Sequence, residues 1–171
     1  MGHYVISPER SQVWIDARSN VHPIHSSTDG LEGFVDLDLS SDGTVDLNAP
    51  SSGKLSLPVD KLKSGNRMED RELQKRIDAR RFPTIEGVLT GLEKADEPGS
   101  YQVSGDVTFR GVTCHEQDLM TITSVDDDTV MLAGKSRFDI RKFGMEPPRV
   151  LMLKVEPEVD IRVEIVAVRE S

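Results

Sequence analysis

The chain has 171 residues, a length typical of one compact domain, and its 21 Lys and Arg against 30 Asp and Glu give a formal net charge of −9 at pH 7. This acidic balance disfavours a nucleic-acid partner, and the single cysteine, Cys114, excludes an internal disulfide or a zinc site built from several cysteines. No apolar run approaches the roughly 20 residues that span a bilayer, and the N-terminus lacks the basic and apolar segments of a secretory signal. We therefore expect one domain over residues 1–171, located in the cytoplasm, with neither bound nucleic acid nor stable membrane insertion.

Apolar and polar residues alternate with period two along most of the chain, which predicts strands with one face turned to a core. The expected strands, in chain order, are Gln12–Ser19, Leu31–Leu39, Lys54–Val59, Ile85–Leu92, Tyr101–Arg110, His115–Thr123, Val130–Phe138 and Val155–Val168. Clusters of Gly, Asp, Ser and Pro separate them, as turns between antiparallel strands require. Phe34 departs from the alternation, because it falls on the acidic face of its strand.

One segment has the features of a helix. Asn66 can cap its N-terminus, and Glu69 follows three residues later, as in a capping box. Met68, Leu73 and Ile77 form a sparse apolar stripe, and the segment must end before Pro83. A single short helix among many strands argues against a parallel α/β sheet and leaves a closed barrel or a sandwich.

The length of the last strand favours the barrel. Val155–Val168 would extend roughly 46 Å at 3.3 Å per residue, about twice the length of a usual sandwich strand. Such strands can close into a barrel of about eight strands, which either fills its interior or encloses one ligand. The chain has only 5 Phe, 2 Tyr and 1 Trp, and several glycines fall within the strands, which favours an interior with room for a ligand.

Five segments in order resemble the YceI-like family. They are YVISPERSQVWI, LEGFVDLDL, LPVDKLKSGNRMEDRELQKRIDARRFPTIEG, YQVSGDVTFRGVT and FDIRKFGMEPP. In the third segment, the characteristic positions are held by Asn66, Asp70, Leu73, Phe82, Pro83, Thr84 and Ile85. The resemblance implies an extended, lipocalin-like antiparallel barrel with one short helix near an opening. It also implies a polyisoprenoid-binding function, with a long isoprenoid, isoprenoid quinone or other fatty ligand held in an apolar tunnel, without catalysis and without a cofactor.

The chain departs from the family pattern after its first long strand. Family members often place a histidine in that strand, whereas this chain has Ser19 and Asn20 there, followed by the long connection VHPIHSSTDG. Its His22 and His25, joined by His115, could form a metal site, and this remains an alternative. We prefer two other interpretations, a hydrogen bond from His22 or His25 to a polar ligand head or a hydrogen-bonded pair with a structural role.

Other polar motifs have simpler structural explanations. Cys114 and His115 are neighbours on an expected strand, so their side chains point to opposite faces and cannot form a nucleophile and base pair. The run Asp126–Asp128 lacks the ligand spacing of a calcium loop and is expected to be a hairpin turn. Arg80 and Arg81, with Arg76, are expected at the C-terminal end of the helix, where positive charge complements the helix dipole; an anionic ligand head is the alternative.

The segment 141–153 is unusually apolar for a loop and contains Phe143, Met145, Pro148, Leu151 and Met152. It could line a ligand tunnel, plug one end of the barrel or form a homodimer surface, and the sequence leaves these alternatives open. A barrel filled by its own side chains, acting as a protein-interaction module, is a further alternative to lipid binding.

The expected ligand-binding residues combine the apolar strand faces with groups near the barrel mouth. The strand residues are Ile15, Val103, Val107, Phe109, Phe138, Ile161 and Val163, and the residues nearer the mouth are Phe34, Phe143 and Met145. His22 or His25 would offer a hydrogen bond to a polar ligand head. No catalytic residue and no metal ligand is predicted beyond the histidine alternative.

Overall fold

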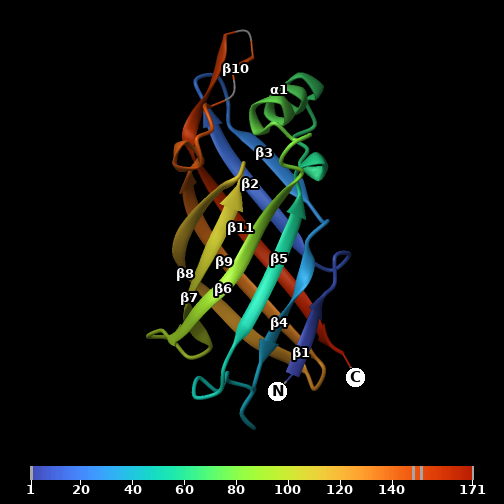
Figure 1. Cartoon of the computed structure of the whole chain (residues 1–171), viewed down its shortest axis with the longest axis vertical. Coiled ribbons are helices and arrows are strands. Elements are labelled where there is room, and N and C mark those ends of the chain that lie inside the picture. The colour runs from blue at the N-terminus through green and yellow to red at the C-terminus, as the bar shows by residue number, and fades with distance from the viewer. Residues whose placement is uncertain (1, 148, 151, 171) are drawn as a thin grey trace.

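The computed structural model describes residues 2–147, 149, 150 and 152–170, which form an antiparallel barrel with a helix at one end (Figure 1). Pro148 and Leu151 of the apolar segment therefore lie outside the described residues. The strands are β1 (Gly2–Ile6), β2 (Gln12–Ser19), β3 (Ile24–Thr28), β4 (Glu32–Leu37), β5 (Ser52–Pro58), β6 (Thr84–Lys94), β7 (Ser100–Phe109), β8 (Val112–Asp126), β9 (Thr129–Asp139), β10 (Arg149–Val150) and β11 (Leu153–Arg169). The helices are α1 (Arg67–Ile77) and two short 3-10 helices, η1 (Val59–Lys61) and η2 (Ile140–Phe143).

Strand β11 closes the barrel. The hydrogen-bonded order is β1-β4-β5-β6-β7-β8-β9-β11, and β11 pairs back to β1, which gives a closed barrel of 8 strands. At 17 residues, β11 is long enough to pair with β1 near its C-terminus and with β2 along its N-terminal part. Every strand pairing is antiparallel, and the predicted fold class is confirmed.

The connection after β2 is more ordered than the sequence indicated. Ile24–Thr28 forms strand β3, which pairs with β2 from Ala17↔Ile24 to Val13↔Thr28. The long connection VHPIHSSTDG thus contains a strand that was not among the expected ones. Two adjacent serines, Ser26 and Ser27, conceal the alternation, because a serine on the inner face gives no apolar signal.

Helix α1 begins at its predicted cap. The side chain of Asn66 accepts hydrogen bonds from the amides of Met68 at 3.0 Å and Glu69 at 3.2 Å, which satisfies two of the free N–H groups at the helix start. The capping box does not form, because the Ser64 hydroxyl instead accepts from the Asn66 amide at 3.3 Å. Glu69 is therefore free to turn toward other partners.

Two sharp features of the backbone depend on glycine. In the hairpin between β7 and β8, Arg110 and Gly111 have φ angles of 53° and 74°, as a two-residue turn with the strand twist requires. In β4, Gly33 has a φ of 138°, and a Cβ there would lie 2.0 Å from the Lys54 carbonyl oxygen. Close packing of β4 against β5 thus requires a glycine at position 33.

Strands β8 and β9 separate toward the helix end of the barrel. They pair from Asp126↔Thr129 up to Met120↔Gly134, and beyond that point β8 pairs only with β7 among the described residues. Helix η2 lies beside the separated part of β8, where the Cys114 thiol is 3.6 Å from the Lys142 carbonyl oxygen. None of the helices in the described residues has the length and hydropathy that crossing a membrane requires.

Candidate functional site: an apolar cavity beneath helix α1

A cavity of about 160 Å³ lies inside the barrel at the end that carries α1, within a larger space that opens to solvent. Only four of its lining residues are polar: Ser26, Ser64, Glu69 and Asp70. The apolar lining residues are Ile15, Ala17, Ile24, Leu62, Leu73, Ile77, Ile85, Val107, Phe109, Phe138, Ile140, Phe143, Met145, Leu153, Val155, Val159 and Ile161.

The strand alternation places these side chains. On β7, Val107 and Phe109 are two residues apart and share the inner face, while on β11 Val159 and Ile161 do the same. Helix α1 covers the opening and directs Leu73 and Ile77 into the cavity, whereas Met68 of the predicted stripe is exposed. The amphipathic helix therefore supplies a roof to the apolar interior.

Helix η2 brings the apolar segment inward. Asp139 caps it by accepting a hydrogen bond from the Arg141 amide at 2.9 Å, and Gly144 ends it in a left-handed conformation. As a result Phe143 and Met145 are each only 3% exposed and line the cavity. The ring of Phe143 packs edge-on against Phe109 at 5.7 Å, so the segment both closes the barrel end and lines the cavity.

Seven of the predicted ligand-binding residues line the cavity. They are Ile15, Val107, Phe109, Phe138, Phe143, Met145 and Ile161. Val103 and Val163 pack against the hydrophobic core but do not line the cavity. Ligand contact by these residues stays a prediction.

Two of the predicted ligand-binding residues, Phe34 and His25, lie outside the cavity. Phe34 points outward from β4 and packs against the ring of His3 at 5.1 Å, because the strand alternation places it on the acidic face with Asp36. His25 points outward from β3, is 70% exposed and pairs with Asp16 at 2.6 Å. Phe34 and His25 are thus not among the residues that line the cavity, and ligand contact by either residue stays a prediction.

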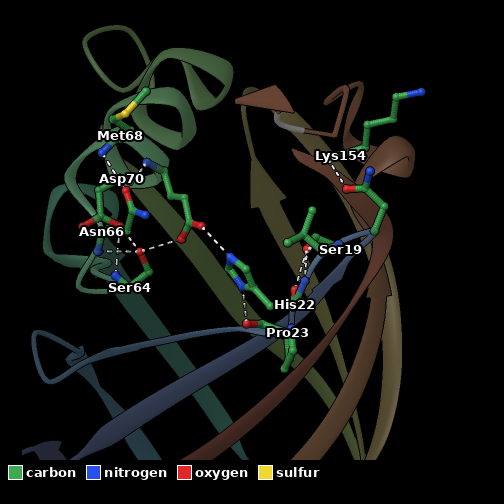
Figure 2. A network of polar contacts seen from close by, with 11 residues as sticks. Ser19, His22, Pro23, Ser64, Asn66, Met68, Asp70 and Lys154 are labelled. Atoms are coloured by element: carbon green, nitrogen blue, oxygen red, sulfur yellow. Dashed lines mark hydrogen bonds and ion pairs between the residues drawn. The ribbon is translucent and has the colours of Figure 1, made fainter. Parts of the chain in front are cut away.

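His22 lies at the edge of the cavity. Its Nε2 is 3.6 Å from Glu69 Oε1, and its Nδ1 is 2.9 Å from the Pro23 carbonyl oxygen. Figure 2 shows His22 directed from the strand side toward the helix start, where Ser64 and Asp70 lie. The hydroxyl of Ser64 donates to Asp70 Oδ1 at 2.7 Å and lies 3.3 Å from Glu69 Oε2, so one polar network borders the apolar space.

The three histidines of the metal alternative are not brought together. His22 contacts Glu69, His25 contacts Asp16, and His115 contacts Asp106 at 2.9 Å on the outer face of β7 and β8. Within residues 2–147, 149, 150 and 152–170, no group of three or more His, Cys, Asp or Glu side chains is arranged to hold a metal ion. The structure does not support a site built from His22, His25 and His115.

Two further carboxyl groups point into the barrel from β8. Glu116 is paired with Gly105, and Asp118 with Val103, so both share the face of Val107 that lines the cavity. Burial raises the pKa of Asp118 above its usual value, although a hydrogen bond from Ser136 at 2.8 Å partly opposes the shift. Sequence reasoning missed these inward carboxyl groups.

Comparison with known proteins identifies the sequence pattern. A profile of the YceI-like domain family matches residues 4–167. No curated protein matches the chain as a sequence relative.

Several solved structures share the fold. Burkholderia cenocepacia BcnA superposes with a TM-score of 0.77 at 16% identity, covering 94% of this chain and 98% of that one. A polyisoprenoid binding domain from Saccharophagus degradans, implicated in plant cell wall breakdown, gives a TM-score of 0.77 at 10% identity, covering 99% of this chain and 100% of that one. The YCEI protein of Campylobacter jejuni gives 0.62 at 14% identity, covering 80% of this chain and 81% of that one.

Proposed function

This chain belongs to the YceI-like domain family, and from that membership and the cavity we propose that it binds a long-chain apolar lipid inside the barrel. The lipid is a polyisoprenoid, an isoprenoid quinone or a fatty derivative, which the protein sequesters or carries without chemical change. The observation that carries the proposal is the cavity itself, whose lining is aliphatic and aromatic except at one edge. The solved polyisoprenoid binding domain of the same fold supports the choice of ligand class.

The physical basis is the transfer of a hydrocarbon chain out of water. Each buried methylene contributes about 0.8 kcal/mol, so a long chain binds tightly through shape and desolvation alone. The polar edge at Ser64, Glu69 and Asp70 suits the head of an amphipathic molecule, with its tail among Val107, Phe109 and their neighbours. One ligand thus satisfies both parts of the lining.

The cavity must widen to take a long chain. At about 160 Å³ it is close in size to an engineered protein cavity of roughly 150 Å³ that binds benzene. Helices α1 and η2 form its roof and end wall, and β8 is separated from β9 beside η2. We infer that these elements move outward when a chain enters.

The placement of the nucleophilic side chain supports binding without catalysis. The thiol of Cys114 faces the Lys142 carbonyl oxygen, whereas the neighbouring His115 points to the outer face and pairs with Asp106. A nucleophile needs a base within hydrogen-bond reach, and these two side chains are on opposite faces. The barrel filled by its own side chains is disfavoured by the open space under α1.

Native mass spectrometry of the purified protein, followed by organic extraction, tests the proposal. We expect a discrete mass above 19.0 kDa that is lost on denaturation and extracts as an isoprenoid or fatty compound. A protein that stays at 19.0 kDa after incubation with prenyl alcohols and quinones would contradict it.

A further inference from the structure

The polar groups that line the cavity are hydrogen-bond acceptors rather than cations. They are the carboxylates of Glu69 and Asp70 and the hydroxyls of Ser26 and Ser64, and no described lining residue is a lysine or an arginine. Ser64 is already engaged, because its hydroxyl donates to Asp70 Oδ1 and accepts from the Asn66 amide. A ligand head at this edge therefore meets carboxylate oxygens that can still accept.

Two arginines near this end of the barrel contact other residues, although Nε of Arg110 is buried without a hydrogen-bond partner among the described residues. Arg76 pairs with Glu72 at 2.8 Å and with Glu146 at 3.2 Å, and Arg110 donates to the Gly144 carbonyl. None of the arginines above is part of the cavity lining, and the nearest imidazole, that of His22, faces Glu69. An anionic head would find no free cation among the residues that line the described cavity.

The barrel beyond the cavity adds further negative charge. Glu116 and Asp118 point inward from β8, and Glu116 Oε1 is buried without a hydrogen-bond partner among the described residues. The ammonium of Lys142 is 3.9 Å from this oxygen, but its side chain is 62% exposed. Water therefore screens its charge, and it offsets the buried carboxylate only in part. Because charges interact strongly where water is scarce, an incoming anion is repelled from both the edge and the interior.

From this arrangement we propose that the protein selects lipids whose head is a hydrogen-bond donor without negative charge, and rejects carboxylate and phosphate heads on the same chain. The inference rests on the proposed lipid-binding function and specifies the ligand class for that site. The head donates its O–H or N–H to Glu69 or Asp70, and the hydroxyl of Ser26, a further lining residue, has no partner among the described residues. A prenyl alcohol, a hydroquinone or a lipid amide meets this requirement, whereas a prenyl diphosphate or a fatty acid does not.

Competition among compounds with one C20 chain tests the selectivity. The protein is loaded with diphenylhexatriene, a headless fluorescent hydrocarbon, and titrated at pH 7.5 with geranylgeraniol, geranylgeranylamine, geranylgeranoic acid and geranylgeranyl diphosphate. We expect the alcohol and the amine to displace the fluorophore at concentrations at least tenfold lower than the acid and the diphosphate. All titrations stay below the concentrations at which the lipids form micelles.

Variants identify the groups responsible. The selectivity gap is the ratio between the concentrations of acid and of alcohol that displace the fluorophore. Glu69→Gln combined with Asp70→Asn is expected to reduce this gap to less than threefold, mainly through tighter binding of the acid. The control, Glu93→Gln with Asp96→Asn, removes two exposed carboxylates at the β6–β7 hairpin and leaves the gap unchanged. If loss of the Asp70 contact to the Ser64 amide prevents folding, Glu69→Gln alone is used and is expected to halve the gap or more.

Three outcomes distinguish the proposed head-group selectivity from the proposed lipid binding. If no C20 compound displaces the fluorophore, the lipid-binding function itself is wrong and the selectivity falls with it. If the acid or the diphosphate displaces it as well as the alcohol does, lipid binding stands and the selectivity is overturned. If the gap persists in a folded Glu69→Gln variant, the assignment of the selectivity to this edge is overturned.

Discussion

Nε2 of His22 lies 3.6 Å from Oε1 of Glu69, which joins the connection between β2 and β3 to the first turn of helix α1. The two side chains differ in exposure, with Glu69 at 11% and His22 at 48%. Figure 2 shows His22 reaching across this edge toward the helix. The contact is thus a polar link between the roof of the cavity and its wall, on the side where a ligand head would sit.

Replacing His22 with alanine should speed ligand release while leaving the fold intact. A partly exposed polar contact of this kind contributes up to about 1 kcal/mol, which corresponds to an increase of up to about fivefold in the release rate. The rate is measured by stopped-flow dilution of the protein loaded with diphenylhexatriene. The midpoint of urea unfolding should change little, because the link holds one edge of the helix rather than the core.

His25→Ala is the matched control for this prediction. His25 lies three residues further along the same connection, but it is 70% exposed and pairs with Asp16 on the outer surface. Its loss should leave the release rate unchanged. Equal acceleration by both variants would show that general loosening of the connection, and not the link to Glu69, governs release.

A carboxylate introduced at Val107 should abolish uptake of apolar ligands. Val107 lines the cavity two residues before Phe109 on the same strand face, and an unpaired charge buried there is strongly unfavourable. Binding of diphenylhexatriene to Val107→Asp is followed by fluorescence, with near-ultraviolet circular dichroism as the test of folding. Val88→Asp, on the exposed face of β6 opposite Asp106, is the control that should bind normally.

Val107→Thr keeps the side-chain shape and serves if the aspartate variant does not fold. Burying its hydroxyl without a partner costs about 1–2 kcal/mol, so affinity for the hydrocarbon should fall roughly five- to thirtyfold. A folded Val107→Asp protein that binds as well as the unmodified chain would show that the ligand lies elsewhere.

The barrel was predictable because its signal is local and repeated. Alternation along Tyr101–Arg110 and Val155–Val168 specifies both the strand and its inner face, and Val107, Phe109 and Ile161 follow directly from it. The helix cap at Asn66 was equally predictable from the sequence, since a cap depends on residues within one turn. These parts of the fold need no information from distant segments.

The misplaced residues depend on contacts between distant segments. Phe34 was expected near the mouth, although the alternation already placed it on the acidic face of its strand, where it meets His3 of β1. Glu69 had a sufficient local explanation as a capping-box residue, which concealed its contact with His22. Asp118 looked like an ordinary polar strand residue, and only the pairing with Val103 reveals that it points inward.

Replacing Asp118 with asparagine should stabilise the protein at neutral pH. Burial raises the pKa of Asp118 in the folded state, so the folded protein holds this proton more tightly than the unfolded chain does. Stability therefore falls as pH rises from about 3.8 through the raised pKa, and the full penalty is present above it. Asparagine removes the charge and can still accept the hydrogen bond from Ser136.

The gain is measured by urea unfolding at pH 7 and at pH 3. We expect less than about 1 kcal/mol at pH 7, because the carboxyl is only partly buried and water screens its charge, and no gain at pH 3. Asp96→Asn, an exposed residue, controls for the change in net charge. A loss of stability in Asp118→Asn at pH 7 would mean that the ionised carboxyl makes a stabilising contact.

Asp139 should remain ionised at pH 3. Hydrogen bonds from the Arg141 side chain, helped by the Arg141 amide, lower the pKa of Asp139 to about 2. Arg141 approaches with its Nη2 at 2.7 Å from Oδ2 and its Nε at 3.0 Å from Oδ1. A lowered carboxyl pKa stabilises the fold above the unfolded value of about 3.8, and this contribution is lost as pH falls through about 2.

Carboxyl chemical shifts followed by NMR from pH 7 to the onset of acid unfolding measure this titration. In Arg141→Gln the pKa of Asp139 should rise toward 3.8 yet stay below it, because the backbone donor remains. Arg137→Gln, which removes a guanidinium paired with Asp160 instead, should leave Asp139 unchanged. Titration of Asp139 near 3.8 in the unmodified protein would contradict the cap of η2, the element that holds Phe143 against the cavity.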